Sequence, residues 1–466
     1  MGRFAYLVAM PFLFFACTLA PTYLRPGPFA PDRWPEGSAY RTSHKSLKIP
    51  SARETGWQEF FTDRRLEEII ETALNNNRDL KLAALNVEEA RAMYGVKRAD
   101  LFPVVNATAA RGKQRMPDTH GFGQKLILTE YSAGLGITSW EIDFFGRIRS
   151  LERQALEEYF ATEEARRGVQ ISLVSEVARI YFTLAADRER LALARSTLKT
   201  QKAYYGLLKK RYDFALATEL DLARARIQVQ AAERDVAYYL RLTASDKNAL
   251  NLLTGYKMPH LLLPENLNDA GGIKKISSGI PSEVLLNRPD IMAAEHRLKG
   301  SYAFIGAARA AFFPHISLTT AIGTASSDLS GLFGAGSKSW KFISNVAMPV
   351  FDARTWAAYR VSKAEQKIAL VKYERTIQNA FREVADSLAV QGTAKRQVLA
   401  QQSLVDAALR IYRLSMKRYD LGIDSYLSVL DAQRSLYAAQ QRLVSLRLLR
   451  ITNRIKLYAA LGGGGD

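Results

Sequence analysis

Residues 211–225 read RYDFALATELDLARA, and residues 418–432 read RYDLGIDSYLSVLDA. Both begin with RYD and carry a leucine nine positions after the arginine, and the second begins 207 positions after the first (418 minus 211). A second pair repeats upstream, NNRDLKLAALNVEEARAMYGVKRADLFP at 76–103 and LNRPDIMAAEHRLKGSYAFIGAARAAFFP at 286–314. Repetition on this scale predicts a duplicated structural unit.

The spacing between the two copies changes once. Asp290 follows Asp79 by 211 positions (290 minus 79), whereas Phe351 follows Phe144 by 207 (351 minus 144). The second copy is therefore four residues shorter (211 minus 207), between Pro314 and Phe351, and we expect this change in a loop. Gly-rich stretches at 112–123 and 331–337 are expected to be the tips of two hairpins.

Each copy predicts a helix, a β-hairpin, a long helix and a further helix. A Phe-Pro pair ends the first helix, because proline cannot continue one. Partial alternation of apolar and small polar residues then predicts strands. No proline occurs between Pro117 and Pro259 or after Pro349, and strong helix formers with nearly heptad apolar spacing fill both spans. The first copy, 58–256, is predicted to hold a helix at about 64–101, a hairpin at about 103–143 and helices at about 147–211 and 218–253. A linker at about 257–281 follows. The second copy, 282–461, is predicted to hold a helix at about 282–312, a hairpin at about 314–350 and helices at about 354–419 and 425–461, before a Gly-rich tail at 462–466.

The chain's one cysteine, Cys17, follows an apolar N-terminal run. Arg3, the apolar stretch 4–16 and the small residue Ala16 have the layout of a secretory signal, so we expect 1–16 to be removed. Cleavage before Cys17 would free this residue for acylation, although Phe14 stands where such signals usually carry leucine. The alternative is an ordinary signal with an incidental cysteine. Residues 17–57, rich in proline, are expected to run extended as a lipid-anchored segment.

Four strands are too few to close a β-barrel, and open strand edges are not tolerated in lipid. After Cys17 no apolar run reaches the roughly 20 residues of a spanning helix. If the strands enter a membrane, several chains must therefore combine them, and three chains would supply twelve.

The sequence resembles the TolC-like outer-membrane factors of tripartite efflux pumps, in their lipoprotein branch. The resemblance covers nearly all of the mature chain. It is carried by ACTLAPTYLRP at 16–26, SWEIDFFGRIRS at 139–150, IQNAFREVADSLA at 377–389, RYDLGIDSYLSVLDAQRSLYAAQQRL at 418–443 and LYAALGGG at 457–464.

The resemblance implies a mainly α fold with a membrane β segment, in which a homotrimer forms a 12-stranded outer-membrane β-barrel continued by a long periplasmic α-helical barrel. It implies a passive exit duct, with a periplasmic membrane-fusion adaptor and an inner-membrane transporter of RND type as partners. It also implies contact with outer-membrane lipid, and diacylglycerol and an N-acyl chain on Cys17.

The repeated turns are the candidate functional site. By similarity the adaptor meets the channel at the two helix–helix turns. Leu427 and Asp431 are four residues apart on one helical face, so in a trimer they would form an apolar ring and an acidic ring at a periplasmic gate, assisted by Asp424. Gly422 suits a left-handed turn, whereas its counterpart Ala215 departs from the usual glycine. The expected docking residues are Arg211, Tyr212, Leu220, Arg418, Tyr419, Gly422 and Ser425.

Composition argues against several other functions. The formal net charge is +19, but Lys and Arg alternate with Glu and Asp without a long basic block, so we expect no nucleic-acid partner. Five scattered histidines and the lack of phosphate-loop or nucleophile motifs predict no metal site, no cofactor and no enzymatic activity. Two alternatives to an efflux-pump exit duct stay open, the exit duct of a type I protein secretion system and a coiled-coil scaffold. The sequence does not identify the substrate.

Overall fold

The computed structural model describes residues 18–27, 31, 33–40, 52, 54–115, 127–274, 276–277 and 285–465. The expected signal peptide and Cys17 lie outside these residues, as does Asp466. The chain divides into two compact units, each built from segments that are distant in sequence. Each unit contains segments of both sequence copies, as expected for a duplicated chain.

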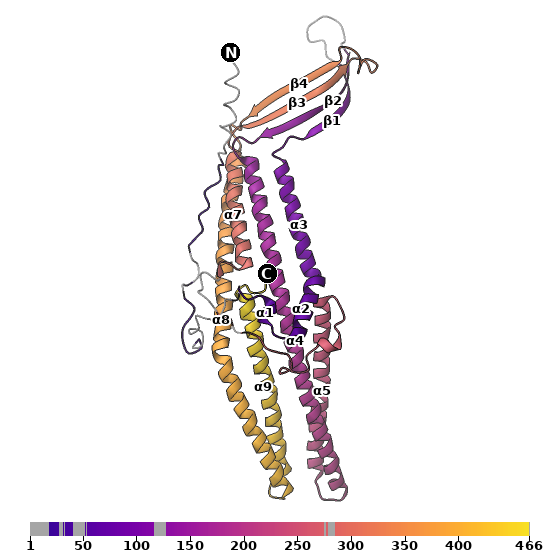
Figure 1. Cartoon of the computed structure of the whole chain (residues 1–466), viewed down its shortest axis with the longest axis vertical. Helices are drawn as coiled ribbons and strands as arrows, with labels where there is room; N and C mark the ends of the chain where they lie inside the picture. The colour runs from indigo at the N-terminus through magenta and orange to yellow at the C-terminus, as the bar shows by residue number, and fades with distance from the viewer. Residues whose placement is uncertain are drawn as a thin grey trace. The chain divides into compact units, whose positions relative to one another are not determined.

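The first unit comprises Met1–Pro26, Asn86–Thr162 and Ala293–Tyr373 and holds one antiparallel sheet (Figure 1). Its strands follow in the order β1-β2-β3-β4, so the two hairpins lie side by side through β2 and β3. The strands are β1 (Val105–Arg115), β2 (Ile127–Ile142), β3 (His315–Ser326) and β4 (Lys338–Ala347).

Part of the length change between the copies lies in the second strand of each hairpin, whereas the sequence-based expectation placed it in a loop. Strand β2 has 16 residues and β4 has 10. Strand β2 also contains a bulge between Ile137 and Trp140, where Ser139 has a φ of 51°. A bulge adds a residue to one strand without lengthening its partner. Gly112, expected in the first loop, pairs with Glu130 inside the sheet.

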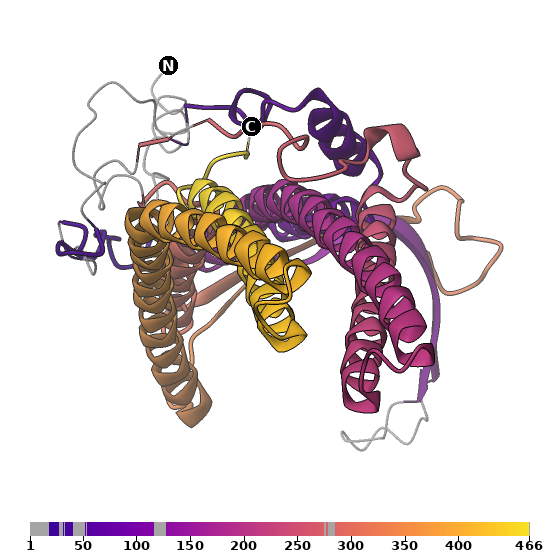
Figure 2. The ribbon, with the colours of Figure 1, turned by 90° about the horizontal axis from the view of Figure 1, so that it is seen from below.

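The second unit comprises Gly27–Leu85, Glu163–Met292 and Glu374–Asp466 and is helical. In it α4 runs beside α5, and α8 runs beside α9 (Figures 1 and 2). The chain's helices are α1 (Trp57–Phe60), α2 (Arg64–Asn76), α3 (Arg78–Ala99), α4 (Arg147–Asp213), α5 (Glu219–Thr254), η2 (His260–Leu262), α7 (Pro289–Ala310), α8 (Ala353–Asp420) and α9 (Tyr426–Ala460).

Helices α4 and α8 have 67 and 68 residues, which corresponds to about 100 Å of α-helix. Their length follows from the absence of proline and the abundance of helix-forming residues. By length and composition one described helix, α4, could span a membrane, but 61 % of its most apolar window is buried inside the structure. The apolar character of α4 is thus accounted for by packing.

The first predicted helix, 64–101, is in fact two helices, α2 and α3, divided at Asn77. Asn77 has extended backbone angles, its side-chain oxygen accepts a hydrogen bond from the N–H of Leu80 at 2.9 Å, and its amide donates to the carbonyl of Leu253 at 3.0 Å. A buried asparagine that satisfies both a helix start and a neighbouring helix carbonyl favours a break over continuation. Helical periodicity alone does not reveal it.

The helix predicted at 282–312 begins at Pro289. Proline restricts the residue before it to extended backbone and suits the first position of a helix. Arg288, which precedes it, is buried and donates to the carbonyl of Ala460 at 2.8 Å, so it satisfies an otherwise unpaired carbonyl at the end of α9. It also pairs with Asp290 at 2.8 Å.

The core of the second unit is centred on Tyr458 of α9. Its ring stacks on Phe60 at 3.9 Å between centroids, and its hydroxyl donates to the carbonyl of Thr55 at 2.7 Å. Phe61 meets the same ring edge-on at 6.4 Å. Burying three aromatic rings together stabilises the unit through large apolar area, with a further gain from ring geometry.

Candidate functional site

The turn between α8 and α9 is closed by two backbone hydrogen bonds. The N–H of Gly422 donates to the carbonyl of Tyr419 at 2.9 Å, and the N–H of Ile423 donates to the carbonyl of Arg418 at 2.9 Å. This pair of bonds is a Schellman motif, which requires a left-handed residue at the position of Gly422. The φ of Gly422 is 72°.

The turn between α4 and α5 has the same geometry although it lacks the glycine. The N–H of Ala215 donates to the carbonyl of Tyr212 at 2.8 Å, and that of Leu216 donates to the carbonyl of Arg211 at 2.8 Å. The φ of Ala215 is 58°. Alanine in this region crowds its Cβ against the following carbonyl, at a cost of about 1–2 kcal/mol. The departure from glycine therefore adds strain without changing the turn.

The starts of the two following helices differ. Thr218 caps α5, and its hydroxyl oxygen accepts from the N–H of Asp221 at 3.2 Å. Ser425 stands at the equivalent position before α9 but makes no side-chain capping hydrogen bond. Instead, Arg418 and Asp424 form a two-pronged ion pair across this turn, at 2.6 and 3.0 Å. The hydrogen bond from Arg418 holds the pKa of Asp424 below its usual range.

A tyrosine cluster connects α4 with the α8–α9 turn. Tyr204 stacks on Tyr426 with 3.7 Å between ring centroids, and its hydroxyl donates to that of Tyr419 at 3.1 Å. Arg211 donates to the same Tyr419 hydroxyl at 2.9 Å and lies 5.8 Å from the ring centroid. The second-copy turn is thus held to a helix of the first copy by stacking and by charge-assisted hydrogen bonding.

The first two turns of α9 have one buried and one exposed face. Tyr426, Val429 and Leu430 are buried against the tyrosine cluster. Leu427 is 46 % exposed and the side chain of Asp431 is 65 % exposed, so the two predicted gate residues lie on the opposite, free face. Arg434 joins them, with its guanidinium 4.0 Å from Asp431.

A family model described as "Outer membrane efflux protein" matches residues 69–256 and 280–463. The chain belongs to the outer membrane efflux protein family. The two matched stretches coincide with the two sequence repeats of this efflux protein.

Two relatives align with nearly the whole efflux protein. The toluene efflux pump outer membrane protein TtgC of Pseudomonas putida is 44 % identical over 460 residues, which is 98 % of this chain and 95 % of that protein. The outer membrane protein OprJ of Pseudomonas aeruginosa is 39 % identical over 455 residues, 97 % of this chain and 94 % of that protein.

Solved structures agree with these relatives. A membrane protein from Pseudomonas aeruginosa superposes with a TM-score of 0.89 at 38 % identity, covering 96 % of this chain and 98 % of its own. The MtrE outer membrane channel of Neisseria gonorrhoeae superposes at 0.85 and 35 %, covering 97 % and 99 %. The expected fold class, mainly α with a membrane β segment, and the expected function, an outer-membrane channel for efflux, are confirmed. The names do not favour protein secretion or a scaffold. The lack of enzymatic activity stays a prediction.

The structure brings together only part of the predicted site. Arg211 contacts Tyr419, and Arg418 pairs with Asp424. Tyr212 and Leu220 are exposed at the first turn.

Sequence analysis missed three residues of this site. Arg434 was detectable from its spacing three after Asp431, but Tyr204 and Tyr426 have no counterpart in the other repeat. Among the residues that the structure describes, no cluster of His, Cys, Asp and Glu is suited to a metal.

A partly buried acidic pair was also not detected from the sequence. Asp246 of α5 faces Asp187 of α4, and Asp187 is paired with Arg190 at 2.6 Å. Burial, followed by the negative charge of Asp187, raises the pKa of Asp246 to about 6. Near neutral pH the efflux protein therefore carries a costly partly buried carboxylate between these two helices.

Replacing Ala215 with glycine is expected to stabilise the first turn by about 0.5 kcal/mol, because relief of the left-handed strain exceeds the added flexibility of glycine. Gly422→Ala is the matched reverse change and should destabilise the second turn by about 1 kcal/mol. Amide hydrogen exchange across each turn measures both effects. Faster exchange in Ala215→Gly, or unchanged exchange in Gly422→Ala, would contradict the assigned turn geometry.

Asp246→Asn is expected to raise stability at pH 7.5 by about 1 kcal/mol, a value reduced for the partial exposure of this side chain. The raised pKa means that the folded protein holds more protons than the unfolded chain between about 3.8 and 6, so wild-type stability falls as pH rises through this window. Thermal unfolding from pH 4 to 8 tests this. The variant should lose this slope, whereas exposed Asp420→Asn should keep it.

Proposed function

We propose that this efflux protein forms a homotrimeric, passive exit duct across the outer membrane. The described sheet leaves β1 and β4 with one neighbour each, and unpaired strand edges are costly in lipid. Large apolar side chains on the sheet are exposed, with Trp340 at 81 % and Phe342 at 61 %. Three chains would pair these edges in a 12-stranded barrel, and exposed aromatic side chains suit its lipid-facing surface.

The observation that carries the gating proposal is the two-faced start of α9. Its buried face holds Tyr426 against the tyrosine cluster, and this orients Leu427 and Asp431 outward from the unit. Around a three-fold axis these residues would form an apolar ring and an acidic ring that restrict passage and favour cations. Arg434 reduces the acidic charge only weakly, because an exposed ion pair at this separation contributes little.

Opening would require α8 and α9 to leave their contacts with α4. The contacts concerned are the Tyr204–Tyr426 stack and the hydrogen bond from Arg211 to Tyr419. A periplasmic adaptor that binds the exposed turns better in the open arrangement would shift the equilibrium toward it. We assign the adaptor-binding surface to the two Schellman turns. The source of energy in this scheme is an inner-membrane transporter of RND type.

The proposed cargo is small organic molecules. Relatives that are 44 % identical are named toluene and antibiotic efflux pump outer membrane proteins. A passive duct has little need of a selective binding site, since a transporter upstream selects what enters it. The cargo of this chain would accordingly match the cargo of its transporter.

The residues after Cys17 support lipid anchoring. Arg309 of α7 donates to the carbonyl of Leu19 at 3.1 Å, and Tyr23 donates to the buried carboxylate of Glu295 at 3.2 Å. Arg25 also pairs with Glu295. A Cβ on Gly306 would lie 2.8 Å from the backbone of Ala20, so only glycine permits this approach. An ordered segment of this kind would hold an acylated Cys17 at a set position beside α7.

Asp431→Ala tests the gate. Single-channel recording in planar bilayers is expected to give a small, cation-selective conductance for the wild type, and a larger, less selective conductance for the variant. Asp406→Ala, an exposed acid on α8, is the matched control and should behave as wild type. Equal conductance of Asp431→Ala and wild type would remove Asp431 from the gate.

Intact-mass analysis of the membrane-extracted protein tests lipidation. The expected mass is that of residues 17–466 plus diacylglycerol and one further acyl chain, and Cys17→Ser should lack both additions. A mature protein of unmodified mass would refute the anchor and leave the trimeric duct standing.

A further inference from the structure

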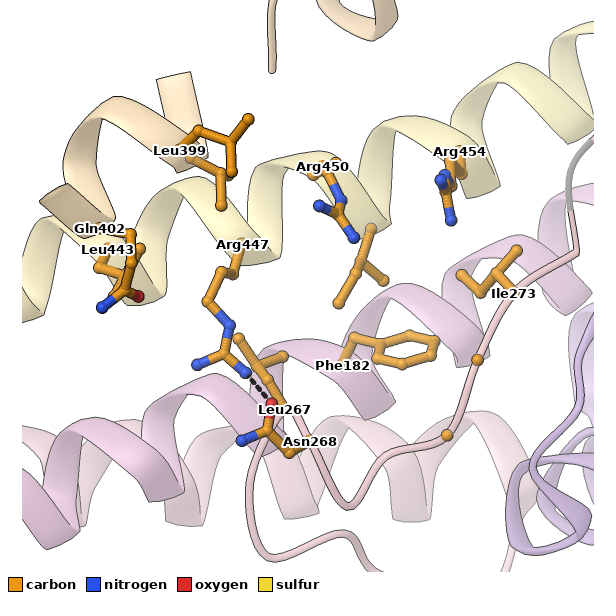
Figure 3. A pocket seen from close by; sticks show the side chains of 14 residues that line it. Phe182, Leu267, Asn268, Ile273, Leu399, Gln402, Leu443, Arg447, Arg450 and Arg454 are labelled. Atoms are coloured by element: carbon orange, nitrogen blue, oxygen red, sulfur yellow. Dashed lines mark hydrogen bonds between the residues drawn. The ribbon is translucent and has the colours of Figure 1, made fainter. Parts of the chain in front are cut away.

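A pocket of about 590 Å³ lies in the second unit, away from the turns and the gate (Figure 3). It is open to solvent and is lined by residues of α4, α8, α9 and the loop between η2 and Ile273. This volume is within the range of sites that bind small molecules. The pocket has no part in the gating scheme.

One wall of the pocket is basic. Arg447, Arg450 and Arg454 follow one another at spacings of three and four on α9, so they share a helix face, and all three line the pocket (Figure 3). Arg447 is neutralised by Glu189 at 2.8 Å and also donates to the side-chain oxygen of Asn268.

The other two arginines, Arg450 and Arg454, differ from Arg447 in this respect. Neither Arg450 nor Arg454 forms an ion pair with any residue that the structure describes. Burial and the neighbouring charge of Arg450 lower the pKa of Arg454. Arg454 is partly buried, whereas Arg450 is exposed to solvent. A partly buried guanidinium normally has a counter-charge, because removing a charge from water is costly. The described part of the chain supplies no such counter-charge to Arg454, and Arg450 adds a second positive charge beside it.

The remaining lining is largely apolar. Leu399, Leu443 and Ile451 leave apolar surface exposed in the pocket. Phe182 and Leu267 also line it, but they are buried and present almost no surface to a ligand. The polar side chain of Gln402 also lines the pocket, and its amide donates a hydrogen bond to Asp406 at 3.0 Å. A ligand that fits both walls has an anionic group at one end and an apolar body at the other.

We propose that this pocket binds a small organic anion. Its carboxylate, phosphate or sulfonate pairs with Arg450 and Arg454, and its apolar body lies against Leu399 and Ile451. Guanidinium groups bind such oxyanions through paired, charge-assisted hydrogen bonds. The site adds an anion-binding activity to the efflux protein and does not depend on the proposed gate or on the trimer.

Equilibrium dialysis of the full-length protein in a non-ionic detergent tests this proposal. The probe is 2-naphthoate, and 2-naphthamide is its uncharged analogue of similar shape. The expected result is saturable binding of one naphthoate per chain, about tenfold or more tighter than binding of the amide. Equal binding of the two compounds, or no saturable naphthoate binding up to about 1 mM, would overturn the proposal.

Variants locate the binding. Arg450→Gln/Arg454→Gln should weaken naphthoate binding by about 30-fold or more, because both charge-assisted contacts are lost. Arg442→Gln is the matched control, since Arg442 is an exposed arginine on the same helix outside the pocket. The double variant should unfold at or above the wild-type temperature, because it removes uncompensated charge. If it does not fold, Arg450→Gln alone, at the exposed position, should still lower affinity severalfold. Wild-type affinity in the folded variants would refute the site.

Discussion

The unpaired outer edges of β1 and β4 are the constraint on which the rest of this molecule depends. Four antiparallel strands in one open sheet leave two rows of backbone N–H and C=O groups without partners within the described sheet. In water such groups bind solvent, but in lipid each one costs several kcal/mol. The chain can therefore be an outer-membrane channel only by sharing its sheet with other chains. In a symmetric assembly each chain contributes one copy of every residue, so the copies of a residue near the axis form a ring around it.

Duplication gives each chain two helix–helix turns, and the two have diverged in ways that suit different roles. Both are Schellman motifs, but the first contains a strained alanine, whereas the second contains glycine and an ion pair between Arg418 and Asp424. The contacts between the copies are asymmetric as well, since Arg211 and Tyr204 of α4 hold Tyr419 and Tyr426. In this scheme one copy is a fixed support and the other is the moving part.

Basic charge is the chain's least ordinary compositional feature. An arginine or lysine in an exposed ion pair or on a solvated helix face carries little energetic weight individually. Arg450 and Arg454 differ because they line a partly apolar pocket and form no ion pair with the residues that the structure describes. A local excess of charge at a shaped site is more informative than the total of +19, because it specifies the chemistry of a partner.

Much of the architecture was predictable from the sequence because it depends on local patterns. Proline positions and helix-forming composition predicted the long helices, alternation predicted the strands, and the RYD repeats predicted where the turns lie. The four-residue spacing of Leu427 and Asp431 was enough to place them on one face. Some local predictions were wrong. The first helix is divided at Asn77, where a side-chain hydrogen bond starts a new helix, and the helix expected from about 282 begins at Pro289. Part of the length difference between the copies lies in β2, which contains a bulge.

The sequence by itself determined the duplication and the order of helices and strands, since both follow from spacing and composition along the chain. The resemblance to efflux channels was also visible in the sequence, through motifs such as the run at 418–443. Only the tertiary structure decided which side chains meet. The Tyr204–Tyr426 stack joins residues 222 positions apart (426 minus 204), and the Asp187–Asp246 pair and the arginine pocket likewise combine distant segments. Such contacts depend on how helices pack and on which charges lose access to water. Neither property has a period that can be read along a single chain.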